Sequence, residues 1–487
     1  MRQVQPSGIS ANFRARSYDL AFVVLLAAFI LFKWHDLYLP YFWDELGVYS
    51  RAAIQFYHQG PSLLPGSLDP EISRGHPLLF QFLSGWMLTI FGNKPFTAHL
   101  FALLVSATLL TAVYTKLKSL YNSSIAFSTA LLLIVQPAFL AISGLLLPEV
   151  MLALWAWLGI TNYYQRNYLR AGLYVSLAIL TKESAISLPV VLLSYSALHY
   201  LFYRDHRGAF RPATLCATIF PFVVLAVFLL IQKQQNAWYF YPYHVSTVTT
   251  NLAEVFFNLK RYLLFLFYQY QRYWLSLLML TALVVACIKG KINIAAGRNN
   301  FLLPGIMMSA AVVIGSCFAF YMARYVMLVF PVLALLSALS IHLLFRKQLV
   351  RFLLLGTLAL TALQVREGNV FAYEDDLSYR KSVTTMQKAI HFTETQLTEG
   401  DTIVGRFPVY HALISPEFGY LTKHLPSRPI DSLYWNHVYY IDTDPGLWEP
   451  KPWPDSLFIP IKEFKDGYAT ARVFELLVHQ RQQLYSK

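Results

Sequence analysis

The sequence has few charged residues for its length. Only 13% of its 487 residues are Asp, Glu, Lys or Arg, whereas 56% are hydrophobic. A soluble protein of ordinary composition has about 25% charged residues, and a single soluble core stops growing near ~300 residues. One large soluble domain is therefore excluded, and the apolar surplus indicates a protein with extensive lipid-facing surface.

Cysteine is also scarce, and several motifs that would indicate cofactor chemistry are missing. Cys216, Cys287 and Cys317 lie in apolar runs and follow neither a disulfide framework nor metal spacing. No Gly-rich phosphate loop of the Walker type occurs, so nucleotide hydrolysis is not indicated, and no His/Cys cluster suggests zinc. We therefore expect no cofactor and no metal, with a divalent metal held by Asp44 or Glu45 as the open alternative.

The positive charge is unevenly distributed along the chain. The net charge is +13, with 27 Lys and Arg against 11 Asp and Glu in residues 1–369, and 12 against 15 in residues 370–487. The excess belongs to the hydrophobic part, where Lys and Arg mark cytoplasmic loops. We therefore interpret it as a topology signal and expect no nucleic acid partner.

About eleven apolar segments approach the ~20 residues that a membrane-spanning helix needs. They cover residues 18–38, 96–115, 124–144, 147–163, 169–183, 184–203, 212–231, 273–288, 301–321, 324–345 and 350–365. Threading them from a cytoplasmic N-terminus places 16 Lys and Arg residues in cytoplasmic segments, as the positive-inside rule requires. The sequence predicts an α-helical polytopic membrane protein, with a bacterial inner membrane as the preferred location.

The same threading defines two extracytoplasmic loops. The first, residues 39–95, contains two predicted interfacial helices, 44–59 and 76–91, because making 76–91 a span would invert every later loop. The second, residues 232–272, contains Lys260, Arg261 and Arg272, which break the positive-inside pattern. These three are interpreted either as a topology error or as anion-binding groups.

The composition changes near residue 370. Residues 1–369 form the predicted transmembrane module, and residues 370–487 have the composition of a small soluble α/β domain on the extracytoplasmic face. Within that domain the pattern predicts an amphipathic helix at 375–398 and strands at 402–410, 437–444 and 456–461.

Carboxylates beside apolar segments are costly, and they are functional candidates for that reason. Asp44 and Glu45 follow the first segment, where they can supply a general base or bind an acceptor; the simpler alternative is a helix cap. Glu149 begins the fourth segment, where the simpler alternative is again favourable helix-start electrostatics.

Basic residues gather on the same predicted face. Arg74 and His76 precede a helix start, a place that favours phosphate, and snorkelling is the alternative for Arg74. Lys182 either holds a phosphate as a point charge or neutralises the adjacent Glu183. Arg324 can clamp a phosphate through two parallel hydrogen bonds or anchor the membrane interface. Together these groups suit an anionic, lipid-linked substrate that reacts at the membrane surface.

In this order the motifs resemble the GT-C superfamily of polyprenyl-phosphate-sugar glycosyltransferases, above all the protein O-mannosyltransferases and the lipid A aminoarabinose transferases. The resemblance covers about residues 1–365. It rests on the Asp44-Glu45 pair, "HPL" at 76–78, "PE" at 148–149, "LTK" at 180–182 and "ARY" at 323–325 followed by Pro331.

The resemblance implies a fold, a reaction and residue roles. It implies sugar transfer, by a hexosyl- or pentosyltransferase, from a polyprenyl-phosphate donor to lipid A, a polysaccharide or a protein, with inversion. Asp44 and Glu45 would be catalytic, and Glu149 and His76 would bind acceptor or sugar. The donor phosphate would be bound by Lys182, Arg324 and Arg74.

The chain departs from the family it resembles at two of these motifs, and a second class of function is an alternative. Related aminoarabinose transferases have Lys-Pro-Pro where this chain has Gly75-His76-Pro77, so the lysine role would pass to Arg74; many relatives have Asp where this chain has Glu149. The alternative function is a polytopic transporter or a flippase for lipid-linked sugars, which favours paired internal repeats. None stands out in the sequence.

Overall fold

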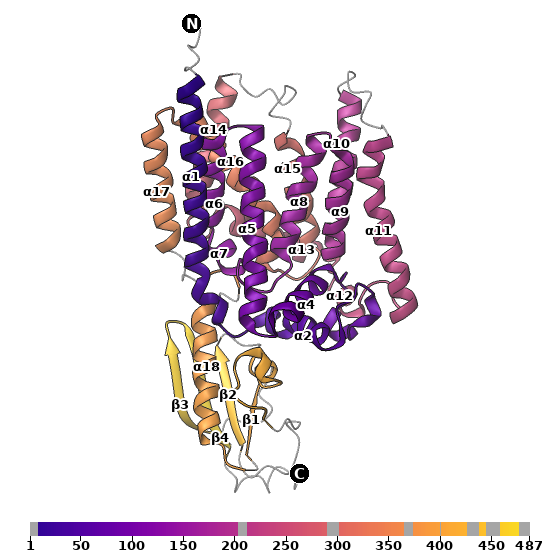
Figure 1. The fold of residues 1–487 in the computed structure, drawn as a ribbon, viewed down its shortest axis with the longest axis vertical. Helices are drawn as coiled ribbons and strands as arrows, with labels where there is room; N and C mark the ends of the chain where they lie inside the picture. The colour runs from indigo at the N-terminus through magenta and orange to yellow at the C-terminus, as the bar shows by residue number, and fades with distance from the viewer. Residues whose placement is uncertain are drawn as a thin grey trace.

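A computed structural model of the chain describes residues 8–202, 212–289, 301–364, 374–399, 401–425, 438–444 and 458–476. Most of the described residues up to 364 form helices that run roughly parallel to one another, and a small sheet domain lies beyond one end of this bundle (Figure 1). The predicted boundary between residues 369 and 370 lies outside the described residues.

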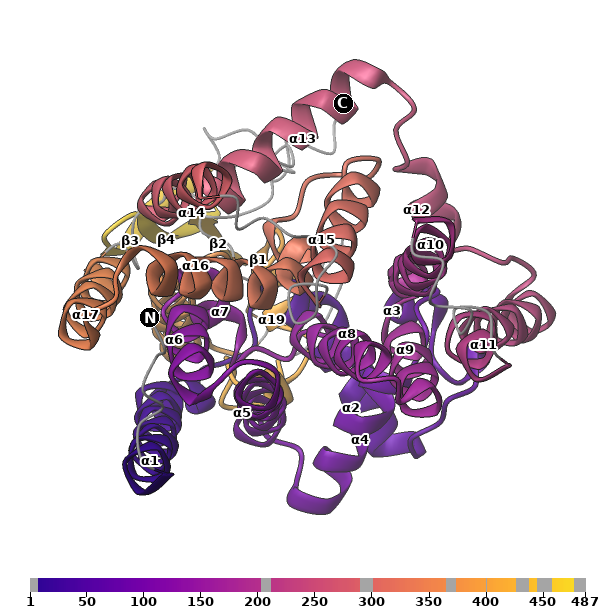
Figure 2. The same ribbon diagram turned by 90° about the horizontal axis from the view of Figure 1, so that it is seen from above.

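Each of the eleven apolar segments overlaps one principal helix of the bundle. These helices are α1 (Gly8–Lys33), α5 (Pro95–Leu120), α6 (Ser123–Ile134), α8 (Glu149–Tyr164), α9 (Tyr168–Thr181), α10 (Ser187–Phe202), α11 (Pro212–Asn236), α14 (Arg272–Ile288), α15 (Leu302–Ser316), α16 (Phe330–Leu344) and α17 (Gln348–Gln364). Contacts run from α5 to α8, from α8 to α9 and from α9 to α11, so these four form a row (Figure 2).

Only some helices of the bundle are long enough to cross a membrane, so the helices alone do not establish the number of membrane spans. Among the described residues four helices are long and apolar enough to cross a membrane: Arg16–Tyr38, Pro95–Leu120, Ala213–Asn236 and Ala323–Leu344. Two more helices, α13 (Leu252–Phe267) and α14, would make one further span but meet at 85°. The remaining apolar helices are shorter, so the count of eleven spans stays a prediction.

The predicted first loop consists largely of short helices at the end of the bundle nearest the sheet domain. After η1 (Trp34–Tyr38) come η2 (Glu45–Tyr49), α2 (Ser50–Gln59), η3 (Pro65–Ser67), α3 (Pro70–Ser73) and α4 (Leu79–Phe91). Helices α2 and α4 lie across the bundle axis (Figure 1). The two helices predicted for this loop, 44–59 and 76–91, therefore lie at this end and do not run through the bundle.

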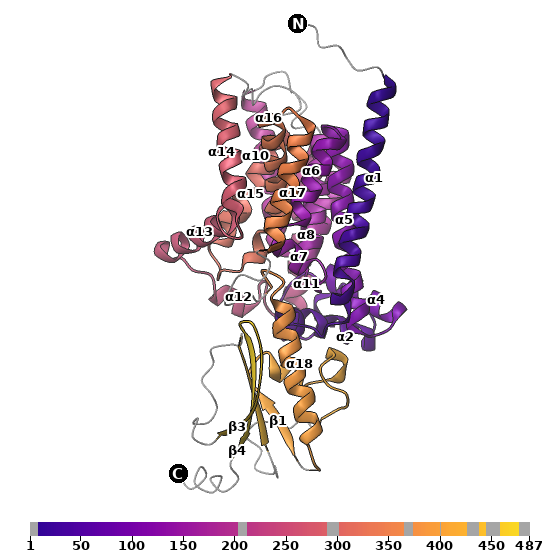
Figure 3. The same ribbon diagram turned by 90° about the vertical axis from the view of Figure 1, so that its left-hand side faces the viewer.

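The second loop is helical rather than extended. It contains α12 (Pro242–Ser246) and α13, which projects sideways from the foot of α14 (Figure 3). Arg272 at the start of α14 donates to Gln136 Oε1 at 2.8 Å and lies over the rings of Phe265 and Phe330. Arg261 lies 3.8 Å from the ring centroid of Tyr321. Contacts with aromatic rings thus hold both arginines, which neither of the two interpretations from the sequence included.

The sheet domain packs one long helix against four strands. Helix α18 (Tyr379–Gln396) precedes β1 (Thr402–Gly405), α19 (Val409–Ala412), η7 (Pro416–Phe418), β2 (Val438–Asp444), β3 (Phe458–Asp466) and β4 (Ala469–Leu476). The strand order is β1-β2-β4-β3; β1 pairs with β2 in parallel and the other pairs are antiparallel. The predicted helix and the strands predicted at 437–444 and 456–461 correspond to α18, β2 and β3. The strand predicted at 402–410 ends at Gly405, because Val409 already begins α19, and β4 was not predicted.

An ionic cluster, called the docking cluster here, joins this domain to the bundle. It consists of Lys33, Asp36, Tyr379 and Arg380. Lys33 at the end of α1 lies 2.5 Å from Asp36, and Arg380 and Tyr379 of α18 donate to the same carboxylate at 2.8 and 3.1 Å. Lys33 also donates to the carbonyl of Leu140, which lies in α7 (Pro137–Ile142), at 2.8 Å. The sheet domain is thereby fixed to the foot of α1.

Candidate active site

Arg324 lies at the centre of a buried group of charges. It belongs to the 3-10 turn η6 (Ala323–Val329) that leads into α16, and it is 3% exposed. Its two terminal nitrogens pair with the carboxylates of Asp44 and Glu374, and its Nε lies 3.3 Å from Glu149 Oε1. A side chain enclosed in this way does not anchor a membrane interface, so that alternative for Arg324 is wrong.

Lys182 joins the same group from α9. Its Nζ lies 3.0 Å from Glu149 Oε1 and 4.3 Å from the centre of the Tyr325 ring. Lys182 has an extended backbone, with φ −160° and ψ 130°, and consecutive side chains of an extended segment point in opposite directions. Lys182 accordingly pairs with Glu149 while Glu183 pairs with His76 at 2.9 Å, so the two neighbours do not neutralise each other.

Asp44 approaches Arg324 from the loop after η1. The preceding residue, Trp43, has φ +49°, a left-handed conformation that is uncommon for a bulky residue and typical of functional turns. The carboxylate of Asp44 does not cap η2, which removes the simpler alternative. Burial alone would raise the pKa of Asp44, but the charge of Arg324 and its hydrogen bond hold that pKa below its ordinary value. Asp44 is therefore a charged carboxylate, with a side chain 23% exposed.

Glu374 completes the group, and the sequence did not single it out. Besides binding Arg324, it accepts a hydrogen bond at 3.2 Å from the backbone N–H of Asp44. Burial, reinforced by the charges of Asp44 and Glu149, raises the pKa of Glu374 to about 8, although Arg324 opposes the shift. The sequence does contain a pattern that could have pointed to Glu374. The acidic run Glu374-Asp375-Asp376 follows the last apolar segment, as the pair Asp44-Glu45 follows the first.

We call this group the Arg324 cluster: Arg324, Lys182, Asp44, Glu149 and Glu374. Two cations face three carboxylates within it, and the buried Oε2 of Glu149 has no hydrogen-bond partner. The group draws on segments from five distant parts of the sequence and lies at the end of the bundle that faces the sheet domain (Figure 1). Its polar atoms are therefore not all satisfied within the protein, which is expected of a site that receives a ligand.

The other predicted site residues lie around this cluster. Glu45 is fully buried and apart from it: its oxygens accept hydrogen bonds from the backbone N–H groups of Phe42 at 3.1 Å and Leu146 at 2.5 Å, and His99 lies 2.8 Å away. Glu45 therefore positions the loops that carry Asp44 and Glu149. Arg74 has φ +48° and is half-buried, and its side chain forms no ion pair with the described residues.

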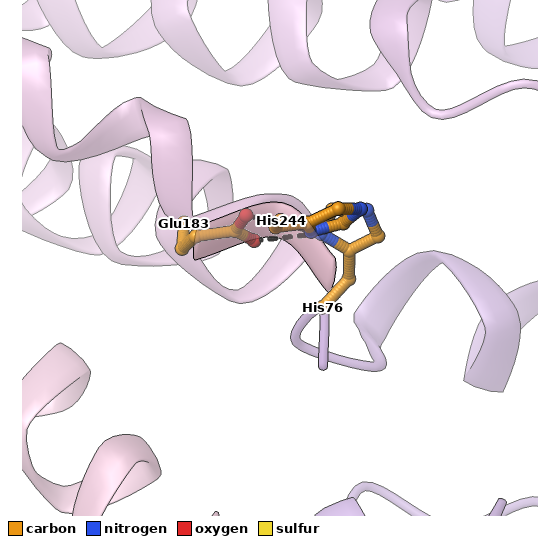
Figure 4. A group of neighbouring side chains, drawn as sticks. All are labelled: His76, Glu183 and His244. Carbon is orange, nitrogen blue, oxygen red and sulfur yellow. Dashed lines mark hydrogen bonds and ion pairs between the residues drawn. The ribbon is translucent and has the colours of Figure 1, made fainter. Parts of the chain in front are cut away.

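His76 belongs to a second, smaller group. Its Nδ1 lies 2.9 Å from Glu183, and its ring centroid lies 5.0 Å from that of His244 in α12 (Figure 4). Burial, aided by the neighbouring His76, lowers the pKa of His244 to about 4. We call His76, Glu183 and His244 the His cluster. It adjoins the Arg324 cluster through the peptide bond between Lys182 and Glu183.

Part of the chain that carries these site residues matches a known protein family. The sequence profile of the dolichyl-phosphate-mannose-protein mannosyltransferase family matches residues 75–231, a stretch that includes His76, Glu149 and Lys182. No curated protein matches the chain by sequence.

Solved structures show the same fold over nearly the whole chain. ArnT from Cupriavidus metallidurans bound to undecaprenyl phosphate is 14% identical with a TM-score of 0.61, covering 94% of this chain and 98% of that one. The chain has the GT-C fold. The same ArnT in the apo state gives a TM-score of 0.56 at 14% identity over 82% of this chain and 84% of that one. The fold that the resemblance implied is confirmed, and the chain is a multi-pass integral membrane protein.

A more distant structure agrees. The archaeal oligosaccharyltransferase AglB from Archaeoglobus fulgidus, in complex with an inhibitory peptide and a dolichol-phosphate, has a TM-score of 0.50 at 11% identity. It covers 86% of this chain and 62% of that one. At these identities the likeness establishes the fold, and the residue roles must be argued from the Arg324 cluster itself.

Proposed function

We propose that this protein is a membrane glycosyltransferase that moves a sugar from a polyprenyl-phosphate donor to an acceptor. The observation that carries the proposal is the Arg324 cluster, where an ionised carboxylate lies beside two buried cations. The matches to the mannosyltransferase profile and to ArnT support the donor class. ArnT is bound to undecaprenyl phosphate in its structure.

The cluster divides the reaction between two kinds of side chain. Asp44 accepts the proton of an acceptor hydroxyl or amine as that group attacks the anomeric carbon. The bond between the anomeric carbon and the phosphate oxygen breaks, and the lipid phosphate carries away the bonding electrons. Arg324, Lys182 and Arg74 stabilise its negative charge. A single displacement of this kind inverts the anomeric centre.

Glu374 gives the site a way to exchange partners. Arg324 is held by carboxylates before the donor arrives, so the phosphate must replace one of them. Glu374 is the carboxylate that gives way most easily, because its pKa of about 8 lets it take up a proton near neutral pH. Its departure would transfer Arg324 to the phosphate and weaken the pairing that holds the pKa of Asp44 low, which makes Asp44 a better base.

The finer assignments follow the resemblance. We place the enzyme among the hexosyl- or pentosyltransferases, with lipid A, a polysaccharide or a protein as acceptor, and in a bacterial inner membrane. In this orientation the N-terminus is cytoplasmic, and the sheet domain lies with the Arg324 cluster on the extracytoplasmic side. Glu149 would face acceptor or sugar, whereas His76, predicted for the same role, is held apart from the Arg324 cluster by its contacts with Glu183 and His244.

The decisive experiment compares glycans and tests the purified protein. Mass spectrometry of surface glycolipids, polysaccharides and glycoproteins with and without the gene should reveal one product that loses a sugar. The purified protein in lipid nanodiscs should then release free polyprenyl phosphate from the corresponding donor only when acceptor is present. Movement of the intact donor between leaflets of a vesicle, with no phosphate released, would instead establish the flippase alternative.

A further inference from the structure

The His cluster brings three potential metal ligands together from three separate elements. His76 lies in the turn before α4, Glu183 begins η4 (Glu183–Ile186), and His244 lies in α12. One ligand atom from each residue lies within 4.8 Å of the other two. Figure 4 shows the two imidazoles side by side with the Glu183 carboxylate directed toward them. The sequence separation of 107 residues between His76 and Glu183 explains why no motif indicated the group.

The surrounding structure holds these three side chains in place. Gly75, beside His76, has φ +69°, and a Cβ there would come within 2.7 Å of the Trp238 ring. Only glycine permits this close contact, which brings the segment 238–244 against the turn of His76. Tyr241 packs edge-on against the rings of Trp238 and His244, with centroids 5.6 Å from each. The position of His244 is therefore fixed by packing, independently of any ligand.

We propose that His76, Glu183 and His244 form a zinc-binding site. Two imidazoles and one carboxylate are a ligand set that Zn²⁺ accepts, with a fourth position left for water. Zinc–ligand distances of about 2.0–2.2 Å require donor atoms about 3.3 Å apart in a tetrahedron, and His76 Nδ1 already lies 2.9 Å from Glu183 Oε2. The ligand atoms of all three residues lie within 4.8 Å of one another, so His244 has to move only a short way toward this pair to complete the set.

The position of the site indicates a structural role. Glu183 directly follows Lys182, and His244 lies in the loop between α11 and α13. Zinc bound here would clamp that loop to the peptide that carries Lys182, next to the Arg324 cluster but not within it. The positive charges of Arg74 and Lys182 lie close enough to affect His244, and they weaken the affinity of the site for zinc. The negative charge of Glu183 strengthens that affinity.

Zinc binding to the full-length protein in nanodiscs tests this proposal without measuring sugar transfer, so its outcome is separate from that of the proposed function. The protein is stripped with chelator, loaded with Zn²⁺ alone, and its metal content is measured by mass spectrometry. We expect one zinc per chain, and Co²⁺ in its place should give the visible absorption of a four-coordinate ion. His244→Ala and Glu183→Gln should each weaken binding by at least about 100-fold, since even outer partners of metal ligands contribute 10–100-fold.

A second histidine–carboxylate pair provides the matched control. His58 Nε2 lies 3.0 Å from Glu417 Oε1, but no third ligand joins that pair among the described residues. His58→Ala should therefore bind zinc as the unaltered protein does. His244→Ala is preferred to His76→Ala because α12 is short and peripheral, and thermal unfolding confirms that each variant is folded. An unaltered protein that binds no zinc, or His244→Ala and Glu183→Gln variants that bind it equally well, would overturn the proposal.

Discussion

Two buried ionic groups lie near the same end of the bundle and differ in how completely they are satisfied. In the docking cluster, Asp36 has both oxygens occupied, by Lys33, Tyr379 and Arg380. In the Arg324 cluster three carboxylates compete for two cations, and Oε2 of Glu149 has no hydrogen-bond partner. Burial is similar in the two groups, so burial does not distinguish them.

This difference distinguishes buried charges that stabilise the fold from buried charges that are available to bind a ligand or take part in catalysis. A buried carboxylate whose oxygens are all bound has no capacity left for a ligand, and its removal strands the cations around it. A cluster with excess carboxylate and unsatisfied atoms costs stability, and proteins retain such costs mainly at functional sites. Mutations in the two clusters should therefore separate activity from stability.

The largest expected effect is on catalysis, at Asp44. Asp44→Asn keeps the shape of the side chain but removes the base, so the rate of sugar transfer should fall by about 10²–10⁴-fold with little change in thermal unfolding. Release of polyprenyl phosphate by the purified variant measures this. Glu71→Gln is the control, since Glu71 is an exposed carboxylate of the same loop and its loss should change neither quantity. Near-normal turnover of Asp44→Asn would remove the assignment.

The opposite pattern is expected in the docking cluster. Asp36→Asn leaves Lys33 and Arg380 without their carboxylate, which should destabilise the protein by about 3–5 kcal/mol. Denaturant unfolding in detergent measures the loss. Asp19→Asn provides the comparison, because Asp19 pairs with Lys118 at an exposed position where such a pair contributes about 0–1 kcal/mol. Equal effects of the two substitutions would show that the docking cluster does not hold the domains together.

A smaller effect is expected where the second loop packs beside the site. Gly75→Ala should destabilise the protein by about 1–3 kcal/mol beyond the backbone strain, because the new Cβ meets Trp238. Gly60→Ala isolates the strain, since Gly60 has φ +93° with no atom within 4 Å of the added Cβ. Thermal unfolding of both variants gives the difference. If the two substitutions cost the same, the contact between Gly75 and Trp238 is not what places the loop.

The smallest effect, taken over one pH unit, is a slope in stability that Glu374 of the Arg324 cluster should produce and the docking cluster should not. The pKa of Glu374 is raised from 4.5 to about 8 in the folded protein, so between these pH values the folded state holds a proton that the unfolded state has lost. Glu374 therefore contributes stability at low pH that disappears as the pH rises through this window, by at most about 1.4 kcal/mol per pH unit. The free energy of unfolding of Glu374→Gln, measured between pH 5 and 8, should lack the decrease with pH that is due to Glu374. Glu71→Gln should retain that decrease.

Much of the fold was predictable because long apolar runs have few structural options. Each of the eleven segments overlaps one principal helix, and the interfacial helices followed from loop charges. The segment 124–144 nevertheless breaks into α6 and the short α7, since Pro137 cannot continue a helix and begins a new one instead. Strand β4 was missed because it lies in the stretch after the last predicted strand, where pairing with β2 and β3 decides its structure.

The site was predictable only where sequence motifs carry it. Asp44, Glu149, Lys182 and Arg324 were singled out because charges beside apolar segments are costly, and the structure brings all four into one cluster. Glu45 was grouped with Asp44 by adjacency, but neighbouring side chains point in different directions, and Glu45 binds backbone groups instead. Glu374 and His244 come from segments interpreted as a soluble domain and as the second extracytoplasmic loop, so only the tertiary structure reveals their contacts.

The extended peptide at Lys182 has one more consequence. Because Lys182 and Glu183 share a peptide bond, a ligand that shifts the backbone at one of them also displaces the other. Free energies of coupling between two binding events are reciprocal. If metal at Glu183 changes the affinity of Lys182 for a lipid phosphate by some factor, the phosphate must change the affinity for metal by the same factor, so the metal content of the protein would depend on whether the donor is bound.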